Sequence, residues 1–407
     1  MSEPNKRKIF NDPVYGFIEI PYQLAFEVIE HPYFQRLRRI KQLGLTEYVY
    51  PGALHTRFHH ALGAMHLMGQ AIEVLRNKGQ DISEAEAIGA TIAILLHDIG
   101  HGPYSHTLEH IIVDLHHETL TSMFLAALNE EFEGKLTTAI AIFEDKYPKP
   151  FLHQLISGQL DMDRMDYLSR DSYFTGVTEG AISYHRLIKM LDVVNGELVV
   201  EEKGLYSVEN FLIARRLMYW QVYLHKTVVC AEQMLILIFK RIKHLKEKGI
   251  EVELPDNIAF FLYNNDRKCD YEKNPKLYLD TFAKLDDSDV IFMIKNFANN
   301  AKIDKTLSYL SEKLLNRRLF KIILQSKDFS KEEYNSILSD FLDNTKYADI
   351  DPNFLIIKGK ESNNTYSKKS NEINILKKNK QVVPLSTISE DGISSKLVTK
   401  YLICYPK

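Results

Sequence analysis

The chain has 407 residues, of which 45% are hydrophobic and 26% are charged, and it carries a formal net charge of −3. These values are ordinary for a globular protein, and they exclude global disorder and fibrous structure. The net charge excludes a bulk electrostatic attraction to DNA or acidic membranes, so any polyanion must be bound by a local cationic patch.

Cysteine use and the length of the apolar runs predict the compartment. The three cysteines, Cys230, Cys269 and Cys404, are too far apart in the sequence for a disulfide framework or a thiolate metal site. The N-terminus has no apolar signal segment, and the apolar runs are far shorter than the roughly 20 residues that a membrane helix needs. We therefore expect a cytoplasmic protein without a membrane partner.

The chain begins with a pattern that predicts a small hairpin and then turns helical. Residues 6–20 contain two short strand-like stretches around Asn11, Asp12 and Pro13, which favour a turn. Residues 23–245 mostly show apolar side chains at helical spacing. We expect residues 1–250 to form a mainly α domain, with this hairpin at its start.

Two features interrupt or extend the helical pattern. Residues 196–207 alternate apolar and polar side chains about Lys203 and Gly204, and they predict a second hairpin at the surface. Residues 208–248 contain neither glycine nor proline, so they predict one long helix or two helices broken near Lys226.

The composition changes after residue 250, where Asp, Lys and Asn become more frequent. We expect peripheral helices at 289–299 and 303–315, and a strand at 396–406 that closes the fold. Residues 358–380 are polar and rich in lysine, which predicts a flexible loop. Residues 251–407 are therefore expected to form a C-terminal α+β subdomain without a chemical motif.

Ten of the fifteen histidines lie between His55 and His117. Histidine binds metals and exchanges protons near neutral pH, so this clustering indicates a metal or acid–base site. His97 and Asp98 follow an apolar run, and the glycines at 100 and 102 allow the backbone to approach a ligand. An isolated His–Asp pair is more often a surface or capping pair.

Other residues strengthen the metal interpretation of the His97–Asp98 pair. His60 and Asp163 lie in separate helical stretches and would complete a set of nitrogen and oxygen ligands. Such a set suits Mn, Fe, Zn, Ni or Co, with positions left open for water.

The pattern H…HD…D resembles that of the HD-domain phosphohydrolases. Residues 8–63, 97–106 and 161–171 resemble the deoxynucleoside triphosphate triphosphohydrolase branch, and the likeness extends over about residues 7–245. It implies an HD-domain helical bundle with small β-hairpins, without the SAM domain of the mammalian members.

The resemblance implies roles for individual histidines and carboxylates. It makes His60, His97, Asp98 and Asp163 the metal ligands. It makes His101 and His117 the catalytic groups that polarise or protonate the reacting phosphate. By contrast, His55, His59 and His66 match no ligand position and are expected to be ordinary packing or surface residues.

The resemblance also implies a substrate site. Without it, each of the basic residues concerned would more often be a solvated helix face. The implied contacts are Gln42 and Leu43 beside the sugar and base, Arg57, His106, Arg164, Arg215 and Lys226 on the phosphates, and Tyr167, Asp171 and Tyr223 around the deoxyribose.

The implied reaction is metal-dependent hydrolysis of a deoxynucleoside triphosphate at the α-phosphorus, which yields deoxynucleoside and inorganic triphosphate. Mg²⁺ is an option on the substrate triphosphate. The family also implies a homo-oligomer, dimer or tetramer, with a regulatory nucleotide pocket at Lys8, Glu30, Gln35 and Arg38. Glu30 stands where mammalian members read guanine with aspartate.

Two other interpretations stay open. One is an HD phosphohydrolase that acts on another phosphoester, such as a nucleoside monophosphate, a cyclic nucleotide or a nucleic acid. The other is a nucleotide-sensing scaffold that does not hydrolyse its ligand. Nucleic acid is not a required partner.

Overall fold

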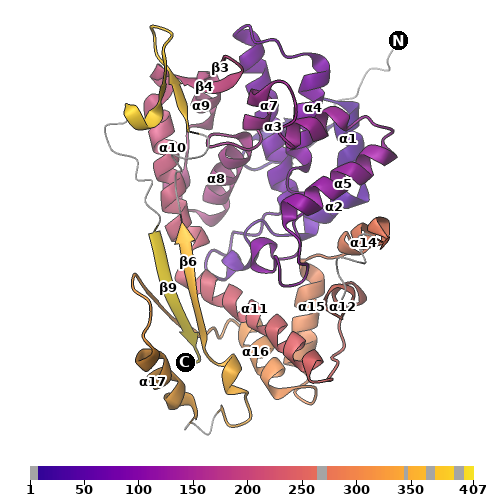
Figure 1. Cartoon of the computed structure of the whole chain (residues 1–407), viewed down its shortest axis with the longest axis vertical. Helices are drawn as coiled ribbons and strands as arrows, with labels where there is room; N and C mark the ends of the chain where they lie inside the picture. Colours follow the sequence, from indigo (N-terminus) through magenta and orange to yellow (C-terminus); the bar gives the residue numbers. More distant parts are fainter. Residues whose placement is uncertain (1–7, 264–272, 343–346, 364–371, 389–397) are drawn as a thin grey trace.

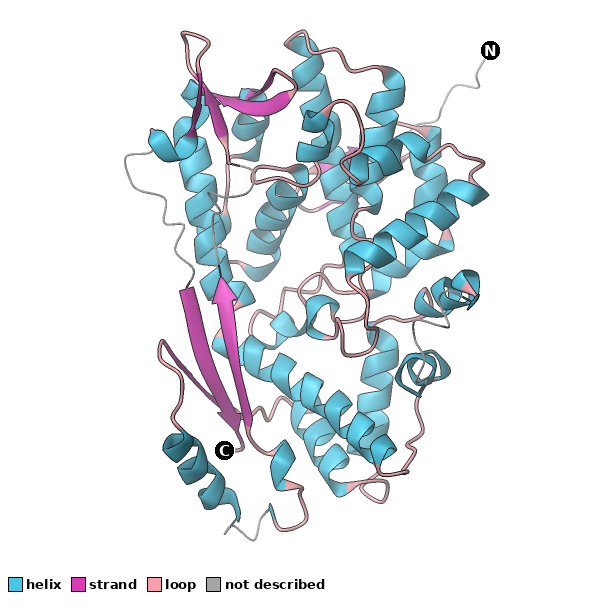
Figure 2. Ribbon diagram, viewed as in Figure 1, coloured by secondary structure: helices cyan, strands magenta, loops and turns pink. Residues whose placement is uncertain are grey.

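The computed structural model describes residues 8–263, 273–342, 347–363, 372–388 and 398–407. Within these residues the chain is mainly α with small sheets, which confirms the expected fold class (Figures 1 and 2). Cys269, residues 364–371 of the expected flexible loop, and residues 396–397 of the expected closing strand lie outside the described residues.

Helices that precede residue 250 form a bundle in the upper part of Figure 1, and the last of them, α11, extends below it. They are α1 (Gln23–Glu30), α2 (Pro32–Gln35), α3 (Arg57–Asn77), α4 (Glu84–Leu96), α5 (His117–Glu131), α6 (Thr137–Phe143), α7 (Pro150–Gln154), α8 (Met162–Thr175), α9 (Tyr184–Met190), α10 (Leu205–Met218) and α11 (Lys226–Glu247).

The central helix of the bundle is α4, which packs against α3 and α6. It starts with a capping box, in which Ser83 Oγ accepts from the Glu86 amide at 3.2 Å and Glu86 Oε2 accepts from the Ser83 amide at 2.7 Å. Ten of its residues are buried, and it ends at His97. The apolar run therefore delivers the His–Asp pair to the interior of the molecule.

Helices α3 and α8 meet closely at Gly63. A Cβ atom at this position would lie 1.9 Å from Asp166 Oδ1 and 2.3 Å from a terminal nitrogen of Arg170. Any other side chain would displace these two buried, charged groups. Glycine at this position lets α8 bring its carboxylates against the histidine face of α3.

Residues 208–248 form two helices rather than one, as the second alternative predicts. After α10 comes a π-helical segment, η6 (Tyr219–Tyr223), and then α11 begins at Lys226. His225 caps α11, because its Nδ1 accepts from the Thr227 amide at 3.2 Å. The break places Tyr223 beside the site described below.

The first hairpin is confirmed. Strand β1 (Ile9–Asp12) pairs antiparallel with β2 (Gly16–Glu19). Asp12 Oδ1 accepts from the amides of Val14 at 2.9 Å and Tyr15 at 3.0 Å, which is the Asx chemistry that the sequence indicates.

The second hairpin exists, but its predicted position is wrong. Strand β3 (Leu191–Val194) pairs with β4 (Glu197–Glu201), and the turn falls at Asn195 and Gly196. Both turn residues have left-handed φ angles, of 54° and 82°, as an Asn-Gly hairpin turn requires. Lys203 and Gly204 instead lie in a short 3₁₀ turn that leads into α10.

Strand β4 also pairs in parallel with β7 (Asn374–Leu376), and β7 pairs with β8 (Val382–Pro384). The prediction of a flexible loop at 358–380 is therefore wrong at both ends of that range. Its start belongs to β6 (Ile357–Asn363) and its end contains β7, because the sheets there supply partners that local composition does not reveal.

The expected closing strand is confirmed as β9 (Val398–Tyr405), which lies between β5 (Lys321–Gln325) and β6. The helices of this half are α12 (Asp256–Tyr263), α14 (Pro275–Phe282), α15 (Asp287–Ala298), α16 (Lys305–Leu315) and α17 (Lys331–Leu342).

Helices α15 and α16 are not peripheral, which corrects the prediction. Their buried residues, among them Val290, Met293 and Leu310, belong to the same apolar cluster as the buried face of α11. Charged residues on their outer faces hide this role in the composition. A domain boundary at residue 250 stays a prediction.

Two further features concern the chain as a whole. Arg36 is completely buried and donates to the carbonyl oxygens of Ile99 at 2.5 Å and His101 at 2.9 Å, which holds the loop after α4 in place. Among the described residues, no single helix is long and apolar enough to cross a membrane. Only the segments Glu202–Tyr223 and Lys226–Glu247, bent by 55°, pass such a test together.

Candidate active site

Four side chains from three helical segments converge at the end of α4. His60 comes from α3, His97 and Asp98 from the C-terminal end of α4, and Asp163 from the first turn of α8. His60 Nε2 lies 3.1 Å from Asp163 Oδ1 and 3.3 Å from His97 Nε2. Asp98 Oδ1 lies 3.4 Å from His97 Nε2, and Asp98 Oδ2 lies 3.7 Å from His60 Nε2.

These separations fit a divalent transition metal. Such ions bind nitrogen and oxygen at about 2.0–2.2 Å, so the ligand atoms that share one ion lie roughly 3–3.5 Å apart. His60, His97 and Asp163 form a group whose ligand atoms all lie within 4.8 Å of one another. The group can hold a metal ion.

Outer hydrogen bonds set both histidines in the tautomer that binds a metal. His60 Nδ1 donates to Asp166 Oδ2 at 2.7 Å, and His97 Nδ1 donates to the Ile94 carbonyl at 2.6 Å. Each Nε2 therefore faces the shared position and is the nitrogen that would bind a metal there. A carboxylate or carbonyl behind a ligating histidine is the usual arrangement in metal sites.

Asp166 is a functional residue that the sequence interpretation missed. Its carboxylate accepts from Arg170 Nε at 3.0 Å, and Arg170 also bonds Asp12 of the first hairpin at 2.7 Å. The available signal was the spacing of Asp163, Asp166 and Arg170, which places them on one face of a helix at intervals of three and four residues.

The pKa directions show that the cluster attracts positive charge. Burial alone would lower the pKa of His60, but hydrogen bonds to Asp163 and Asp166 outweigh burial and raise it to about 10. Burial would raise the pKa of Asp163, but hydrogen bonds to His60 and His97 hold it well below its usual range. The carboxylates of Asp98, Asp163 and Asp166 therefore favour a cation between the histidines.

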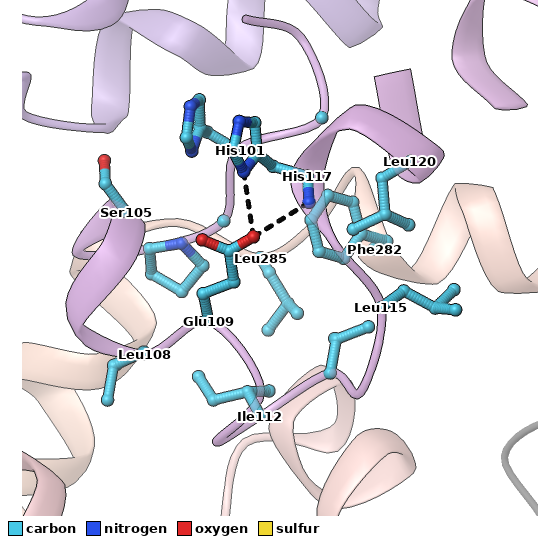
Figure 3. Close-up of a pocket in the computed structure, with 14 residues that line it drawn as sticks. His101, Ser105, Leu108, Glu109, Ile112, Leu115, His117, Leu120, Phe282 and Leu285 are labelled. Carbon is cyan, nitrogen blue, oxygen red and sulfur yellow. Dashed lines mark hydrogen bonds and ion pairs between the residues drawn. The ribbon is translucent and has the colours of Figure 1, made fainter. Parts of the chain in front are cut away.

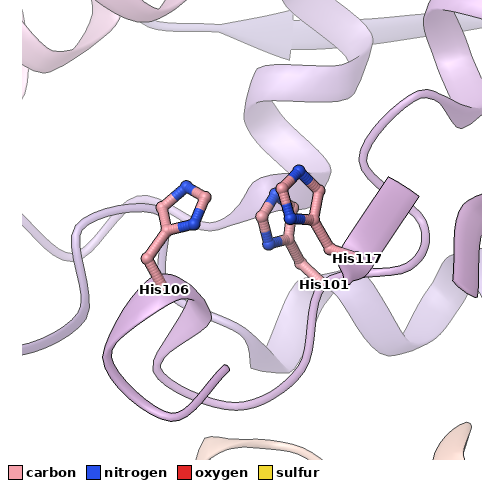
Figure 4. Close-up of side chains that lie close together, drawn as sticks. All are labelled: His101, His106 and His117. Carbon is pink, nitrogen blue, oxygen red and sulfur yellow. The ribbon is translucent and has the colours of Figure 1, made fainter. Parts of the chain in front are cut away.

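Beside the cluster, the rings of three more histidines pack together. The rings of His101 and His117 stack with centroids 4.0 Å apart, and His106 meets both edge-on, as Figure 4 shows. His101 Nε2 lies 3.4 Å from Asp98 Oδ1. Burial and the nearby Arg57 hold the pKa of His101 well below its ordinary value, so this ring is neutral.

Glu109 is a second residue that the sequence interpretation missed. Its Oε1 accepts from His117 Nδ1 at 2.8 Å and from the His117 amide at 3.0 Å (Figure 3). Its Oε2 lies 3.1 Å from His106 Nδ1. Burial would raise the pKa of Glu109, but these bonds hold it far below its usual range. A loop carboxylate eight residues before its histidine has no periodicity that would reveal it.

Gly100 of this loop serves the packing of the protein rather than a ligand, which corrects the expectation from the sequence at that position, whereas Gly102 has room for a Cβ. A Cβ on Gly100 would lie 2.2 Å from the His117 carbonyl oxygen, and one on Gly102 would touch Phe282 at 3.5 Å. Gly100 thus brings His101 and His117 together. Phe282 and Leu285 close an apolar pocket of about 350 Å³ behind Glu109 (Figure 3).

Arg57 connects the metal cluster to a larger cavity. It pairs with Asp98 through one terminal nitrogen, and its Nε donates to Ser105 Oγ at 2.8 Å. We call the adjoining hollow of about 1370 Å³ the substrate cavity. Its lining includes Gln42, Leu43, Gly44, Thr46, Arg57, Tyr104, Ser105, His106, Thr107, Arg164, Tyr167, Asp171, Tyr219, Tyr223, Leu224, Glu232, Gln233, Ile236 and Glu361.

Asp171 lines one side of the substrate cavity, and two hydrogen bonds hold its carboxylate in place. Asp171 Oδ1 accepts from His55 Nε2 at 2.7 Å, and Asp171 Oδ2 accepts from the Tyr223 hydroxyl at 2.7 Å. His55 is 1% exposed and stacks on Phe174 at 4.5 Å. His55 is therefore not a surface residue; it packs in the interior and holds a carboxylate of the cavity.

The structure does not bring all the expected phosphate contacts to the cavity. Arg164 lines it and donates from Nε to the Gly158 carbonyl at 2.6 Å. Arg215 is buried outside the lining and donates to Gln159 at 3.3 Å. Lys226 is exposed at the start of α11. The substrate roles of these residues stay predictions.

The structure brings two of the four expected regulatory residues to one groove. Glu30 and Gln35 line a groove of about 1120 Å³ that Arg39 and Lys284 also border. Lys8 and Arg38 are not in that lining; they lie over the rings of Phe26 at 4.1 Å and Phe58 at 3.5 Å.

Comparisons with known proteins agree with this geometry. Residues 57–171 match the model of the HD domain, and residues 182–254 match the HD associated region. The uncharacterized protein YwfO of Bacillus subtilis is 30% identical over 100% of this chain and 95% of its own length. A phosphohydrolase from Bacteroides thetaiotaomicron superposes with a TM-score of 0.93 at 45% identity, over 99% of this chain and 100% of that chain.

A more distant relative is named for an activity. The deoxynucleoside triphosphate triphosphohydrolase SAMHD1 homolog of Dictyostelium discoideum is 29% identical over 68% of this chain and 57% of its own length. The chain thus spans little more than half of that relative.

The helical fold and the His–Asp cluster define a hydrolase of the metal-dependent phosphohydrolase class. The chain belongs to the HD-domain family.

Proposed function

We propose that this protein hydrolyses deoxynucleoside triphosphates to deoxynucleoside and inorganic triphosphate. The proposal rests on one observation: the metal cluster, Arg57 and the substrate cavity adjoin one another. The metal cluster adjoins Arg57, Arg57 opens onto the substrate cavity, and the cavity carries the ordered Asp171 wall. The named activity of the Dictyostelium relative supports it.

The residues of the site have distinct tasks. Arg57 and Arg164 bind the triphosphate, because guanidinium groups pair with phosphate oxygens. Tyr167, Asp171 and Tyr223 pack against the sugar, where a fixed wall leaves no room for a 2′-hydroxyl. The ligand set suits Mn, Fe, Zn, Ni or Co, and a bound ion supplies Lewis-acid activation of a phosphoryl oxygen and of the attacking water.

Proton transfer falls to the histidines beside Asp98. Glu109 accepts a hydrogen bond from His117 Nδ1, so Nε2 is the nitrogen that exchanges a proton with the reacting group. Neutral His101, stacked on His117, polarises the phosphate beside it. When the bond between the α-phosphorus and the 5′-oxygen breaks, the departing oxygen takes up one proton.

The test is product analysis. Purified protein is incubated with each of the four dNTPs and Mn²⁺, and the products are separated by ion exchange. Release of intact triphosphate and deoxynucleoside supports the proposal, and His97→Ala combined with Asp98→Ala is expected to abolish it. Orthophosphate or pyrophosphate instead would show that the enzyme cleaves another phosphoester. Tight dNTP binding without turnover, retained in the double variant, would indicate a nucleotide-sensing scaffold.

The proposal extends to assembly and regulation. We place a regulatory nucleotide at the groove beside Glu30 and Gln35, with Lys8 and Arg38 moving from their aromatic partners to its phosphates, between copies of a homo-oligomer. Light scattering measures the mass of the assembly, and the change in that mass when nucleotide is added tests whether the nucleotide binds between copies.

A further inference from the structure

The substrate cavity contains acceptor groups that neither a metal ion nor a triphosphate requires. Glu232 from α11 and Glu361 from β6 both line it, and Gln42 lies in the same lining. A triphosphate carries about four negative charges, so two carboxylates in its cavity need another explanation.

Neither carboxylate is paired with an arginine or lysine of the described residues. Burial raises the pKa of Glu232 to about 7, a hydrogen bond from Thr107 opposes the rise, and Glu361 adds to it. Among the described residues, no arginine or lysine contributes to that pKa, and burial alone accounts for the raised pKa of Glu361. Arg57 is instead committed to Asp98 and Ser105 at the metal cluster.

Gln42 supplies a third acceptor. Its side-chain Oε1 is buried and has no hydrogen-bond partner within the described part of the chain. Its backbone N–H donates to the His55 carbonyl at 3.0 Å. A buried, unpaired carbonyl costs about 1–3 kcal/mol, which a donor on a ligand would recover. The cavity is thus cationic where it meets the metal cluster and rich in acceptors elsewhere.

A ligand that fits this polarity is anionic at one end and rich in N–H donors at the other. Guanine presents N1–H and the N2 amino group side by side, and a carboxylate can accept both at once. Adenine and cytosine present one amino group. Thymine presents a single N3–H between two carbonyl oxygens, which carboxylates repel.

We propose that Glu232 and Glu361, with Gln42, read the Watson–Crick edge of the substrate base and make dGTP the preferred substrate and dTTP the poorest. This inference rests on the proposed function, because it assumes that a deoxynucleoside triphosphate occupies the cavity. A site built to hydrogen-bond a substrate discriminates strongly against analogues that leave its polar groups unpaired.

The experiment compares kcat/KM for the four dNTPs in the wild-type protein, in Glu232→Gln and in Glu361→Gln. Both substitutions preserve size and replace one acceptor oxygen with a donor. Glu247→Gln, at the exposed end of the same helix α11, is the matched control. We expect wild type to favour dGTP over dTTP by about tenfold or more. Each cavity variant is expected to lower kcat/KM for dGTP about tenfold, while kcat/KM for dTTP does not fall, because the new amide no longer repels the thymine carbonyl oxygens.

A binding experiment tests the base preference without requiring hydrolysis. Calorimetry measures binding of dGTP and dTTP analogues that carry nitrogen in place of the scissile 5′-oxygen, with Mn²⁺ present. The same dGTP preference, lost in both cavity variants and kept in Glu247→Gln, supports the inference whether or not the analogues' parent nucleotides are hydrolysed.

Other outcomes separate the two proposals. Triphosphate release at equal rates from all four dNTPs would overturn base reading while leaving the proposed function intact. Equal analogue affinities together with no hydrolysis of any dNTP would overturn both. If the two variants change the dependence on free Mg²⁺ equally for all four nucleotides, the carboxylates hold a cation and base reading is wrong.

Discussion

Glu109 holds two histidines in position at the candidate active site. It accepts from the ring and the amide of His117 and contacts His106 with its other oxygen. Since its pKa is held far below the usual range, it is ionised throughout the range in which such an enzyme works. An ionised carboxylate behind a histidine stabilises the protonated ring, which is the form that donates to a leaving oxygen.

We therefore expect Glu109→Gln to lower kcat by roughly 10²–10⁴-fold with little change in KM, the usual range for a proton-transfer group. Steady-state kinetics with a dNTP and Mn²⁺ measure this. Glu118→Gln, an exposed substitution one residue after His117, serves as the control. A loss below threefold would mean that Glu109 has only a packing role.

His55 acts on the cavity through Asp171. The buried ring donates to one oxygen of this carboxylate while Tyr223 donates to the other, so the carboxylate cannot rotate. We expect His55→Gln to loosen the wall beside the sugar and to reduce the dNTP-over-rNTP ratio of kcat/KM by about tenfold. Matched assays with dGTP and GTP measure the ratio. His66→Gln is the control, since His66 lies about two and a half turns into α3 and is not part of the cavity lining. An unchanged ratio in a folded His55 variant would contradict the assignment.

At the scale of elements, the start of α15 holds the loop that carries the candidate catalytic groups. Asp287 Oδ1 accepts from the Tyr104 amide at 2.8 Å, and its Oδ2 accepts from the Lys41 amide at 2.9 Å. Tyr104 and Ser105 have φ angles of 52° and 48°, which are uncommon for residues with a side chain. The two hydrogen bonds hold this unusual turn between Arg57 and His106.

Burial raises the pKa of Asp287 to about 6, although the amides of Lys41 and Tyr104 oppose the rise. The folded pKa lies above the unfolded value of about 3.9, so this contribution to stability is complete below about pH 4 and is lost as pH rises through 6. Between pH 5 and 7.5 the loss is roughly 1 kcal/mol.

We expect Asp287→Asn to lack this pH dependence. The free energy of unfolding of wild type minus that of the variant should fall by roughly 1 kcal/mol between pH 5 and 7.5, as measured by urea titration. The difference between the pH values is the readout, because the amide also changes the hydrogen bonds by a constant amount. A flat difference would show that Asp287 titrates at its ordinary pKa when folded.

At the scale of the whole molecule, a bound metal would join three helices. The ligands come from α3, α4 and α8, and behind them Asp166 and Arg170 lead to the first hairpin. An ion that binds the folded chain stabilises it by about 2.7 kcal/mol at a concentration of 100 Kd.

Chelation should therefore lower the melting temperature by several degrees, and Mn²⁺ should restore it. Differential scanning calorimetry of wild type and of the His97→Ala, Asp98→Ala variant makes the comparison. The variant is expected to melt at the same temperature with and without Mn²⁺. Equal Mn²⁺ responses in the two proteins would place the ion elsewhere.

The sequence determined the class of fold and the residues that converge at the metal cluster. Helical spacing, the Asx turn at Asp12 and the His97–Asp98 pair after an apolar run are local patterns, and local patterns follow from the chemistry of neighbouring residues. The family resemblance joined His60 and Asp163 to that pair. The structure brings His60, His97 and Asp163 into one group that can hold an ion, with Asp98 Oδ1 3.4 Å from His97 Nε2.

Only the tertiary structure decided which residues support and shape the site. Glu109, Asp166 and Asp287 act through partners that are distant in the sequence or lie in irregular loops, and Glu361 reaches the cavity lining from β6. The order of residues 357–363 and the burial of α15 depend on neighbouring strands and helices. Such contacts depend on how separate segments pack, and packing between distant segments leaves no periodic trace in either of them.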